Sequence, residues 1–393
     1  MNSVYSNEKA LTKVLFYMEK RGILVDQEYV MGALQHEQAE IEKEKEHFKA
    51  LTGRAYKDSP KLFKEIFTEM GSAFPTTAKG NPSFTSEVLA KIKVNPAPQI
   101  EKIREHEKRA GTYYSSFLYH MDTNSVLHAN IRQAGTKTGR FSYSDPNLQN
   151  VPKEDDQADL TKKWVVRGSF IPREDFVLCS IDYDQVEYKL MLDYAGEQSI
   201  IERVLGGEDL HQATADMVGI SRKNAKTLNF SILYGSGIVS IAQALGISRS
   251  EAECLRSKYF SRLPKVKRFI SQVTRTGEAR GYIFNWMNRK YHLKDANFSY
   301  ALPNHLIQGG AAEVVKVAMV RIHELLKNTR SSMILQVHDD IISEIHKDEM
   351  DLIPKIRNIM QGVYTPKNGL FLTASPQVST KSWAYRDFED FKC

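Results

Sequence analysis

Four unusual side chains recur at intervals of four residues in the segment SRKNAKTLNFSILYG: Arg222, Lys226, Phe230 and Tyr234. Since four residues turn a helix by about 40° more than one revolution, all four lie on one slowly turning stripe. The first two are cations at the N-terminal end of the helix, where backbone N–H groups already favour an anion. The last two are flat rings that can stack on a base. This segment predicts a polyphosphate clamp beside a stacking surface, and the alternative is a solvated basic helix with two core aromatics.

Carboxylates stand at the ends of two apolar runs elsewhere in the chain. Asp182 lies at the exit of FVLCSIDY, which is typical of a buried strand. His338, Asp339 and Asp340 form the tip of a predicted hairpin within MILQVHDDIISEI. Carboxylates in such positions are common ligands of divalent cations. Each Asp alone could equally be a helix cap or an ordinary turn residue.

The segment TKTGRFSYSDPNLQNVP, residues 136–152, is dense in turn formers, amides and hydroxyls. Such a surface suits hydrogen bonds to backbone phosphates or base edges. We expect its central Arg140 to reach a minor groove. The four-residue TKTG pattern alone is weak evidence.

The elements around these segments alternate between helices and short strands. Apolar spacing predicts a first helix closed by Gly22, and a charge-rich helix over residues 26–51 whose charged face we expect to be solvated. Further helices are expected over residues 248–281, interrupted at Pro264, and over residues 304–319. The stretch GYIFNWMNRKYHL predicts a hairpin or turn. The chain is therefore expected to be an α+β protein.

Composition narrows the class of protein only moderately. The chain has 393 residues with 54 Lys and Arg against 48 Asp and Glu, a formal charge of +6 that is compatible with a nucleic-acid partner. Three widely spaced cysteines favour neither a disulfide framework nor a zinc cluster, and the default is a reducing cytoplasm. We find no signal peptide and no apolar run near the length of a membrane span, about 18 residues.

Taken in order, these motifs resemble the polymerase domain of family A DNA polymerases, the DNA polymerase I type. DYDQVEYK, residues 182–189, is similar to the first motif of that family, and the second, RxxxKxxxFxxxYG, is intact from residue 222. QVHDD, residues 336–340, is similar to the third motif, QVHDE. MEKRGILVD, the TxTGRxSxxxPNLQNxP pattern, DLHQATA and NHLIQGGAAE match flanking patterns, so that the resemblance spans nearly the whole chain.

The resemblance implies template-directed DNA synthesis with two Mg²⁺ ions, held by Asp182, Asp339 and the backbone carbonyl of Tyr183. Lys226 would join the two aspartates as a catalytic residue, and Asp340 would be an accessory acid. The residues implied around the deoxynucleoside triphosphate are Gln185, Glu187, His211, Arg222, Lys226, Phe230 and Tyr234. Those implied on the primer-template DNA are Arg140, Asn147, Gln149, Asn304, Gln308 and His338.

The implied architecture is a right hand with an antiparallel-sheet palm, a helical thumb and helical fingers. Residues 1–25, 136–195 and 301–393 would form the palm, 26–135 the thumb and 196–300 the fingers. No exonuclease domain is recognised, which predicts a polymerase without its own proofreading. The sequence is either an excised fragment or a free-standing polymerase of viral or phage origin, and we favour the second. We expect it in the cytoplasm of a bacterial or phage-infected cell, with a separate exonuclease or processivity factor as further partners and no membrane.

Five positions depart from the family pattern. Asp340 replaces Glu, Asp184 replaces Ser, Lys189 replaces Arg, Ser231 replaces Gly, and Tyr300 stands where an arginine on the template strand is expected. Two other functions are compatible with parts of this pattern. A single-subunit RNA polymerase shares the hand and the basic helix, but Glu187 and Phe230 favour deoxynucleotides. A catalytically silent DNA clamp is disfavoured because Asp182 and Asp339 are both present.

Overall fold

A five-stranded antiparallel sheet forms the centre of the computed structural model, which describes residues 3–77, 79–153 and 162–392. Its strand order is β11-β10-β5-β9-β8. The strands are β5 (Phe176–Tyr183), β8 (Ser332–Val337), β9 (Asp340–His346), β10 (Ala374–Ser379) and β11 (Glu389–Asp390). Together with the surrounding helices this confirms the α+β class.

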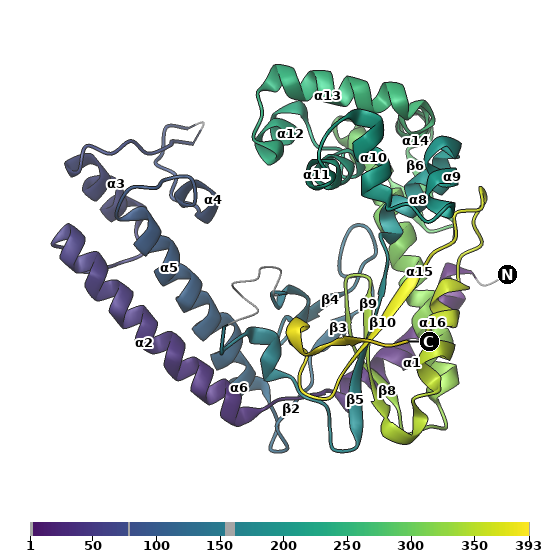
Figure 1. The fold of residues 1–393 in the computed structure, drawn as a ribbon, viewed down its shortest axis with the longest axis horizontal. Helices are drawn as coiled ribbons and strands as arrows, with labels where there is room; N and C mark the ends of the chain where they lie inside the picture. Colours follow the sequence, from purple (N-terminus) through teal and green to yellow (C-terminus); the bar gives the residue numbers. More distant parts are fainter. Residues whose placement is uncertain (1–2, 78, 154–161, 393) are drawn as a thin grey trace.

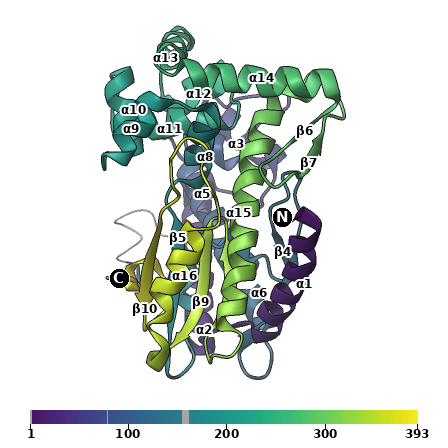
Figure 2. The same ribbon diagram turned by 90° about the vertical axis from the view of Figure 1, so that its right-hand side faces the viewer.

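Three helices cover one face of this sheet: α1 (Val4–Arg21), α15 (Leu302–Leu326) and α16 (Leu352–Gln361) (Figure 2). The first helix buries the predicted apolar face and ends at Gly22. Apolar burial of these helices against the strands is the main source of stability of this layer.

Buried ion pairs connect α1 and α15 to each other and to Arg289. The side chain of Lys316 on α15 is 0% exposed, and its Nζ lies 2.6 Å from Oε1 of Glu8 on α1. Arg289 donates to both Glu8 and Glu313. Lys316 and Glu313 thus have partners of opposite charge, which buried ions require.

A second cluster of buried ion pairs is centred on a carboxylate of the sheet itself. The side chain of Glu344 on β9 is 0% exposed and contacts Arg21 at 2.9 Å and Arg173 at 2.5 Å. The backbone N–H of Arg173 also donates to Glu344 Oε1 at 3.1 Å. One carboxylate therefore links β9, the end of α1 and the loop before β5.

Two helical arms rise from the sheet and leave an open space between them (Figure 1). The first arm consists of α2 (Gln27–Thr52), α3 (Pro60–Glu69), α4 (Ser86–Leu89), α5 (Ala97–Glu107), a π-helical segment (Lys108–Ser115) and α6 (Ser116–His120). The second consists of α8 (Val186–Ala195), α9 (Gln198–Leu205), α10 (Leu210–Val218), α11 (Arg222–Leu233), α12 (Ile238–Leu245), α13 (Arg249–Arg262) and α14 (Pro264–Arg280). The predicted interruption at Pro264 is confirmed by the break between α13 and α14.

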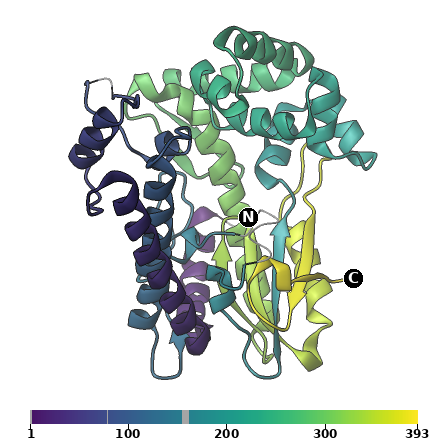
Figure 3. The same cartoon turned by 60° about the vertical axis from the view of Figure 1, so that its left-hand side comes forward.

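The first arm has a hydrophobic core of its own at its outer end, where α3 and α4 pack against α2 and α5 (Figure 3). Its buried residues are Phe48, Phe63, Ile66, Phe67, Phe84, Leu89, Ala97, Ile100 and Ile103. Among the described residues they form a cluster separate from the main core, which extends from the sheet into the second arm.

The expectation of a solvated charged face on α2 is wrong at its centre. Glu37 is only 2% exposed, and its carboxylate contacts His106 Nδ1 at 2.5 Å and Arg109 Nε at 2.9 Å. These partners come from α5 and the π-helical segment, so that the charged face packs against helices from later in the chain. Burial opposes ionisation of Glu37, but the hydrogen bond from His106 and the charge of Arg109 outweigh it and lower its pKa.

Short two-stranded ribbons complete the fold. They pair β1 (Ile23–Leu24) with β2 (Val126–Leu127), β3 (Asn130–Arg132) with β4 (Ser142–Ser144), and β6 (Tyr282–Phe284) with β7 (Lys290–His292). The last pair confirms the hairpin predicted from GYIFNWMNRKYHL. No described helix has the length and apolar character needed to cross a membrane.

Candidate active site

The sheet register brings the predicted acids together. Asp182 on β5 is the direct neighbour of Asp340 on β9, and the N–H of Tyr183 donates to the carbonyl of Asp339 at 3.4 Å. His338 has a φ of +58°, a left-handed turn that places Asp339 at the hairpin tip. Asp182 and Asp339, separated by 156 residues in the sequence, are therefore neighbours at one end of the sheet.

Burial and mutual repulsion raise the pKa values of these acids. Burial, with the nearby carboxylates of Asp339 and Asp340, raises the pKa of Asp182 to about 9. Burial also raises the pKa of Asp339, and it raises that of Asp340 to about 6 against the opposing hydrogen bond from Ser180. The three carboxyl groups favour a compensating cation, because their charges are close together and poorly solvated.

Asp182 differs from Asp340 in what its oxygens contact. Ser180 Oγ lies 2.8 and 2.7 Å from the two oxygens of Asp340, whereas Asp182 Oδ1 is buried with no hydrogen-bond partner among the described residues. No set of three His, Cys, Asp or Glu side chains in residues 3–77, 79–153 and 162–392 has metal-site geometry. An oxygen-only pair with an unsatisfied buried oxygen fits Mg²⁺, which binds few protein ligands and keeps waters.

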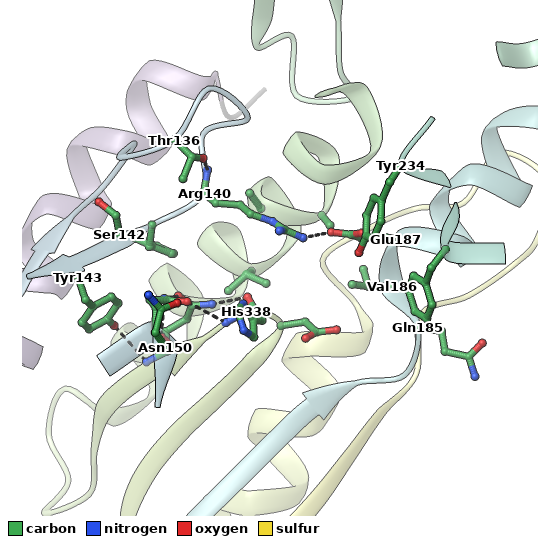
Figure 4. Close-up of a pocket in the computed structure, with 18 of the residues that line it drawn as sticks. Thr136, Arg140, Ser142, Tyr143, Asn150, Gln185, Val186, Glu187, Tyr234 and His338 are labelled. Atoms are coloured by element: carbon green, nitrogen blue, oxygen red, sulfur yellow. Dashed lines mark hydrogen bonds and ion pairs between the residues drawn. The ribbon is translucent and has the colours of Figure 1, made fainter. Parts of the chain in front are cut away.

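A cleft of about 550 Å³ opens beside these acids between the sheet and the second arm. Arg140 reaches into it and forms an ion pair with Glu187, the second residue of α8 (Figure 4). Gln185, just before α8, has a φ of +55°, a turn between the strand-end acid and Glu187. The predicted residues that line the cleft are Arg140, Asn147, Gln149, Gln185, Glu187, Phe230, Tyr234, His338 and Asp339.

Amide side chains form one wall of the cleft. Gln149 Nε2 donates to the carbonyl of Gln336 at 2.9 Å and to its Oε1 at 3.1 Å. Gln336 Nε2 in turn donates to the carbonyl of His338, and its backbone N–H donates to the Tyr143 hydroxyl at 3.2 Å. Gln336 and Tyr143 were not among the predicted site residues, although Gln336 is the first residue of the QVHDD motif.

Helix α11 contributes the aromatic half of the predicted stripe, Phe230 and Tyr234, to the other wall. Ser221 caps its N-terminus by accepting from the N–H of Asn224. The guanidinium of Arg222 contacts both oxygens of Asp209, at 2.9 and 2.8 Å. The rings of Phe230 and Tyr234 are stacked with centroids 5.9 Å apart. Arg222 therefore pairs with Asp209, a partner that the prediction did not include, and the role of the stripe as a clamp stays a prediction.

His211 lies on α10 beside this stripe. Its ring centroid is 5.8 Å from that of Phe230, and its Nδ1 is 3.0 Å from Nδ2 of Asn229. Burial lowers the pKa of His211 to about 4, with Arg222 and Lys226 as nearby positive charges. The ring is therefore neutral at pH 7, and its buried Nε2 has no hydrogen-bond partner in the described part of the chain.

A sequence model described as DNA polymerase family A matches residues 27–384. The chain belongs to DNA polymerase family A. The thermostable DNA polymerase I of Thermus thermophilus is 31% identical over 387 residues, covering 91% of this chain and 46% of the relative. DNA polymerase I of Streptococcus pneumoniae is 31% identical over 381 residues, covering 90% and 43% respectively. The family A chain thus spans less than half of the length of these relatives.

A solved structure extends the likeness to the fold. The POL domain of Pol1 from M. smegmatis, in a complex with DNA primer-template and dNTP, superposes with a TM-score of 0.86 at 25% identity. The superposition covers 96% of this chain and 70% of the M. smegmatis chain. The right-hand polymerase architecture predicted for this family A chain is thereby confirmed.

Several predicted site residues do not line the cleft, among them Asp182, His211, Arg222 and Lys226. Asn304 and Gln308 are on α15, before Ala311 and Ala312, which do line it. The Tyr183 hydroxyl donates to the carbonyl of Met360 at 2.7 Å, away from the acids. Only the backbone of Tyr183 is then available beside Asp182.

Two departures from the family pattern, Asp184 and Lys189, share Thr373 as a hydrogen-bond partner. Lys189 Nζ donates to Thr373 Oγ1 at 2.6 Å, and the Thr373 hydroxyl donates to Asp184 Oδ2 at 2.6 Å. Ser375 Oγ is 3.1 Å from Asp184 Oδ1. Asp184 and Lys189 thus fix the loop before β10 to the start of α8, and the added acid has hydroxyl partners of its own.

Proposed function

We propose that this chain is a template-directed DNA polymerase that extends a primer 3′-hydroxyl with deoxynucleoside triphosphates. The observation that carries the proposal is that Asp182 and Asp339 are neighbours, and that Asp339 lines a cleft together with Phe230 and Tyr234 of α11. The N-terminal turns of the same helix carry Arg222 and Lys226, so that cations, a triphosphate and a base would be bound along one helix. Membership of family A supports the same reaction.

Two Mg²⁺ ions held by Asp182, Asp339 and the carbonyl of Tyr183 would make the primer hydroxyl nucleophilic and stabilise charge on the departing pyrophosphate. Arg222 would exchange Asp209 for the triphosphate, since both present oxygens to a bidentate guanidinium. Lys226, one turn further along α11, would neutralise the pyrophosphate and supply a proton to it. The neutral His211 would donate or accept one hydrogen bond beside it.

The rings of Phe230 and Tyr234 would pack on the incoming sugar and base. Gln185 and Glu187 would contact the sugar, and Glu187 would exclude a 2′-hydroxyl. Arg140, Asn147, Gln149, Asn304, Gln308 and His338 would contact primer and template, chiefly at minor-groove acceptors that correct pairs share. Such contacts test pairing geometry without reading sequence.

We further propose that the first arm lies in the thumb, residues 26–135, that α9 to α14 of the second arm lie in the fingers, residues 196–300, and that α8 belongs to the palm. The polymerase fold accounts for almost all of the described chain, which supports the proposal that this chain does not excise mismatched primer ends. The matched relatives are bacterial DNA polymerases I, which supports action in the cytoplasm, and a phage origin with a separate exonuclease or processivity factor stays a prediction. Release of terminal nucleotides by the pure protein would refute the proposal that this chain does not excise mismatched primer ends.

Primer extension tests the central proposal. With Mg²⁺, a primed template and four deoxynucleoside triphosphates, the pure chain should add nucleotides to the primer in the order that the template dictates. Comparable incorporation of ribonucleotides would instead favour an RNA polymerase. Binding of the DNA without extension would favour the silent clamp.

Replacing Glu187 with Ala should raise ribonucleotide incorporation relative to deoxynucleotides by about 10²-fold, because the side chain that meets the 2′-hydroxyl is removed. The ratio of kcat/KM for the two triphosphates measures the effect. Arg140→Ala is the matched control: it removes the ion-pair partner and leaves the carboxylate in place, so most of the discrimination should persist. Equal loss in both variants would show that the Arg140–Glu187 ion pair, and not the carboxylate alone, excludes the ribose.

A further inference from the structure

A chain of buried hydrogen bonds inside the second arm ends at His211. Its members are Tyr259 on α13, Tyr188 on α8, Asn229 on α11, and Thr214 and His211 on α10, and none of them is more than 1% exposed. These four helices pack together in the second arm (Figure 1). Because all five side chains are shielded from solvent, the direction of each hydrogen bond follows from the partners that are available.

The first end of this chain is Tyr259. Its hydroxyl oxygen lies 2.7 Å from that of Tyr188 and has no other hydrogen-bond partner among the described residues. A buried hydroxyl proton without an acceptor is costly, so Tyr259 donates to Tyr188. The Tyr188 hydroxyl then donates its own proton to Oδ1 of Asn229, at 2.8 Å. The side-chain amide of Asn229 is thereby oriented with its oxygen toward Tyr188 and its nitrogen away from it.

The contacts on α10 fix the amide in the same orientation. The Thr214 hydroxyl donates to the backbone carbonyl of Leu210 at 3.1 Å, so its oxygen accepts from Nδ2 of Asn229, also at 3.1 Å. The same Nδ2 lies 3.0 Å from Nδ1 of His211 and has a second proton for it. Since an amide nitrogen can only donate, Nδ1 of His211 accepts and carries no proton.

The single proton of the His211 ring is therefore on Nε2. Burial lowers the pKa of the ring, and the positive charges of Arg222 and Lys226 outweigh Asp209 in the same direction, so that a second proton is disfavoured. The Nε2–H group is a buried donor without a partner in the described part of the chain, which is the signature of a group that waits for a ligand. Phosphate oxygens match this donor because they only accept, whereas a lone pair at Nε2 would repel them.

We propose that Asn229 is a positioning residue that holds the proton of His211 on Nε2, so that the ring donates a hydrogen bond to an oxygen of the incoming triphosphate. The inference rests on the proposed polymerase function and deepens it, because a neutral His211 alone could either donate or accept. Tyr188 and Thr214 act through Asn229, whose amide they hold in one orientation. The hydrogen bond between α10 and α11 thus joins the two helices and also selects the tautomer of the ring.

Nitrogen-15 spectra of the histidine rings test the tautomer directly. The chain has 11 histidines, and the signal that is missing from the His211→Gln variant identifies His211. The spectra are recorded without substrate at about pH 8.5, where an imidazole with the ordinary pKa of about 6.5 is neutral. In the wild type we expect the proton on Nε2 and none on Nδ1. In Asn229→Asp a carboxylate accepts where the amide donated, so the proton should move to Nδ1.

The kinetics of single-nucleotide incorporation, measured at the same pH, test the role of the tautomer toward the triphosphate. Asn229→Asp should raise KM for the deoxynucleoside triphosphate about tenfold and change kcat less, since one hydrogen bond to a charged oxygen is lost. In the His211→Gln background the same substitution should change KM less than about threefold, because the glutamine amide keeps a donor and has no tautomer to switch. A merely structural effect of the substitution would be equal in both backgrounds.

Tyr259→Phe is the matched control. It removes an equally buried hydroxyl of the same chain, but Tyr188 can still donate to Asn229, so both the tautomer and KM should stay those of the wild type. A proton on Nδ1 in the wild type would overturn the proposal, as would equal increases in KM for Asn229→Asp in the two backgrounds. Failure of the wild type to extend any primer, with the expected spectra, would instead contradict the proposed function.

Discussion

Replacing Asp182 with Asn should lower the rate of nucleotide addition by about 10³-fold or more while leaving DNA affinity nearly unchanged. The substitution keeps the size of the side chain and removes the charge that would hold a cation. The environment of Asp182 makes this loss severe, because its Oδ1 is buried with no hydrogen-bond partner among the described residues and is therefore open to a bound cation. Single-turnover incorporation of one nucleotide, with DNA binding measured separately, gives both quantities.

Asp184→Asn is the matched control for this experiment. Asp184 lies two residues away and keeps hydroxyl partners in Thr373 and Ser375, so its conversion to the amide should alter the rate less than about threefold. Asp339→Asn should reproduce the loss seen for Asp182→Asn. Retention of a tenth or more of the wild-type rate in either variant would contradict the assignment of these two carboxylates.

The largest effect on stability is expected for Glu344→Gln, which should lower the free energy of unfolding by about 3 kcal/mol. The carboxylate is 0% exposed and serves both Arg21 and Arg173, which are about a quarter exposed. Loss of its charge leaves two guanidinium groups facing a neutral amide, and partial solvation of the arginines keeps the loss at the lower end of the range for broken buried pairs. Urea denaturation followed by circular dichroism measures the change.

Glu253→Gln provides the comparison. Glu253 pairs with Arg249 at 3.0 Å on the surface of α13, with side chains 52% and 75% exposed, so its loss should cost less than about 1 kcal/mol. Equal small losses for the two variants would show that Glu344 is effectively solvated. The primer-extension rate of Glu344→Gln at a temperature where it is folded should match the wild type.

Local sequence patterns predicted the elements of the site better than they predicted which elements are neighbours in the fold. The strand ending at Asp182 and the hairpin carrying Asp339 were both evident from apolar runs and turn residues. That they are neighbours depends on β5 pairing with β9, a contact between distant segments that no local spacing encodes. Only the resemblance to family A anticipated it.

Packing between helices distant in the sequence accounts for the main difference between the predicted and the observed structure. The interleaved charges of α2 are typical of a solvated face, yet Glu37 is buried because the segment after α5 supplies Arg109 opposite it. Likewise the stripe on α11 was predicted from its spacing, but its ion pair with Asp209 was not, because that partner lies on another helix. Gln336 was visible as a motif residue, and its bridging role required the position of Gln149.

The separate core at the outer end of the first arm divides this molecule into two energetic units. Because Phe48, Phe63 and Phe84 belong to a cluster distinct from the core under the acids, that end can open or refold while the sheet stays intact. It can also be exchanged for another small helical unit at the ends of α2 and α5 without disturbing the residues around Asp182. The stability of that end of the arm and the geometry around Asp182 are therefore properties that evolution or an engineer can vary one at a time.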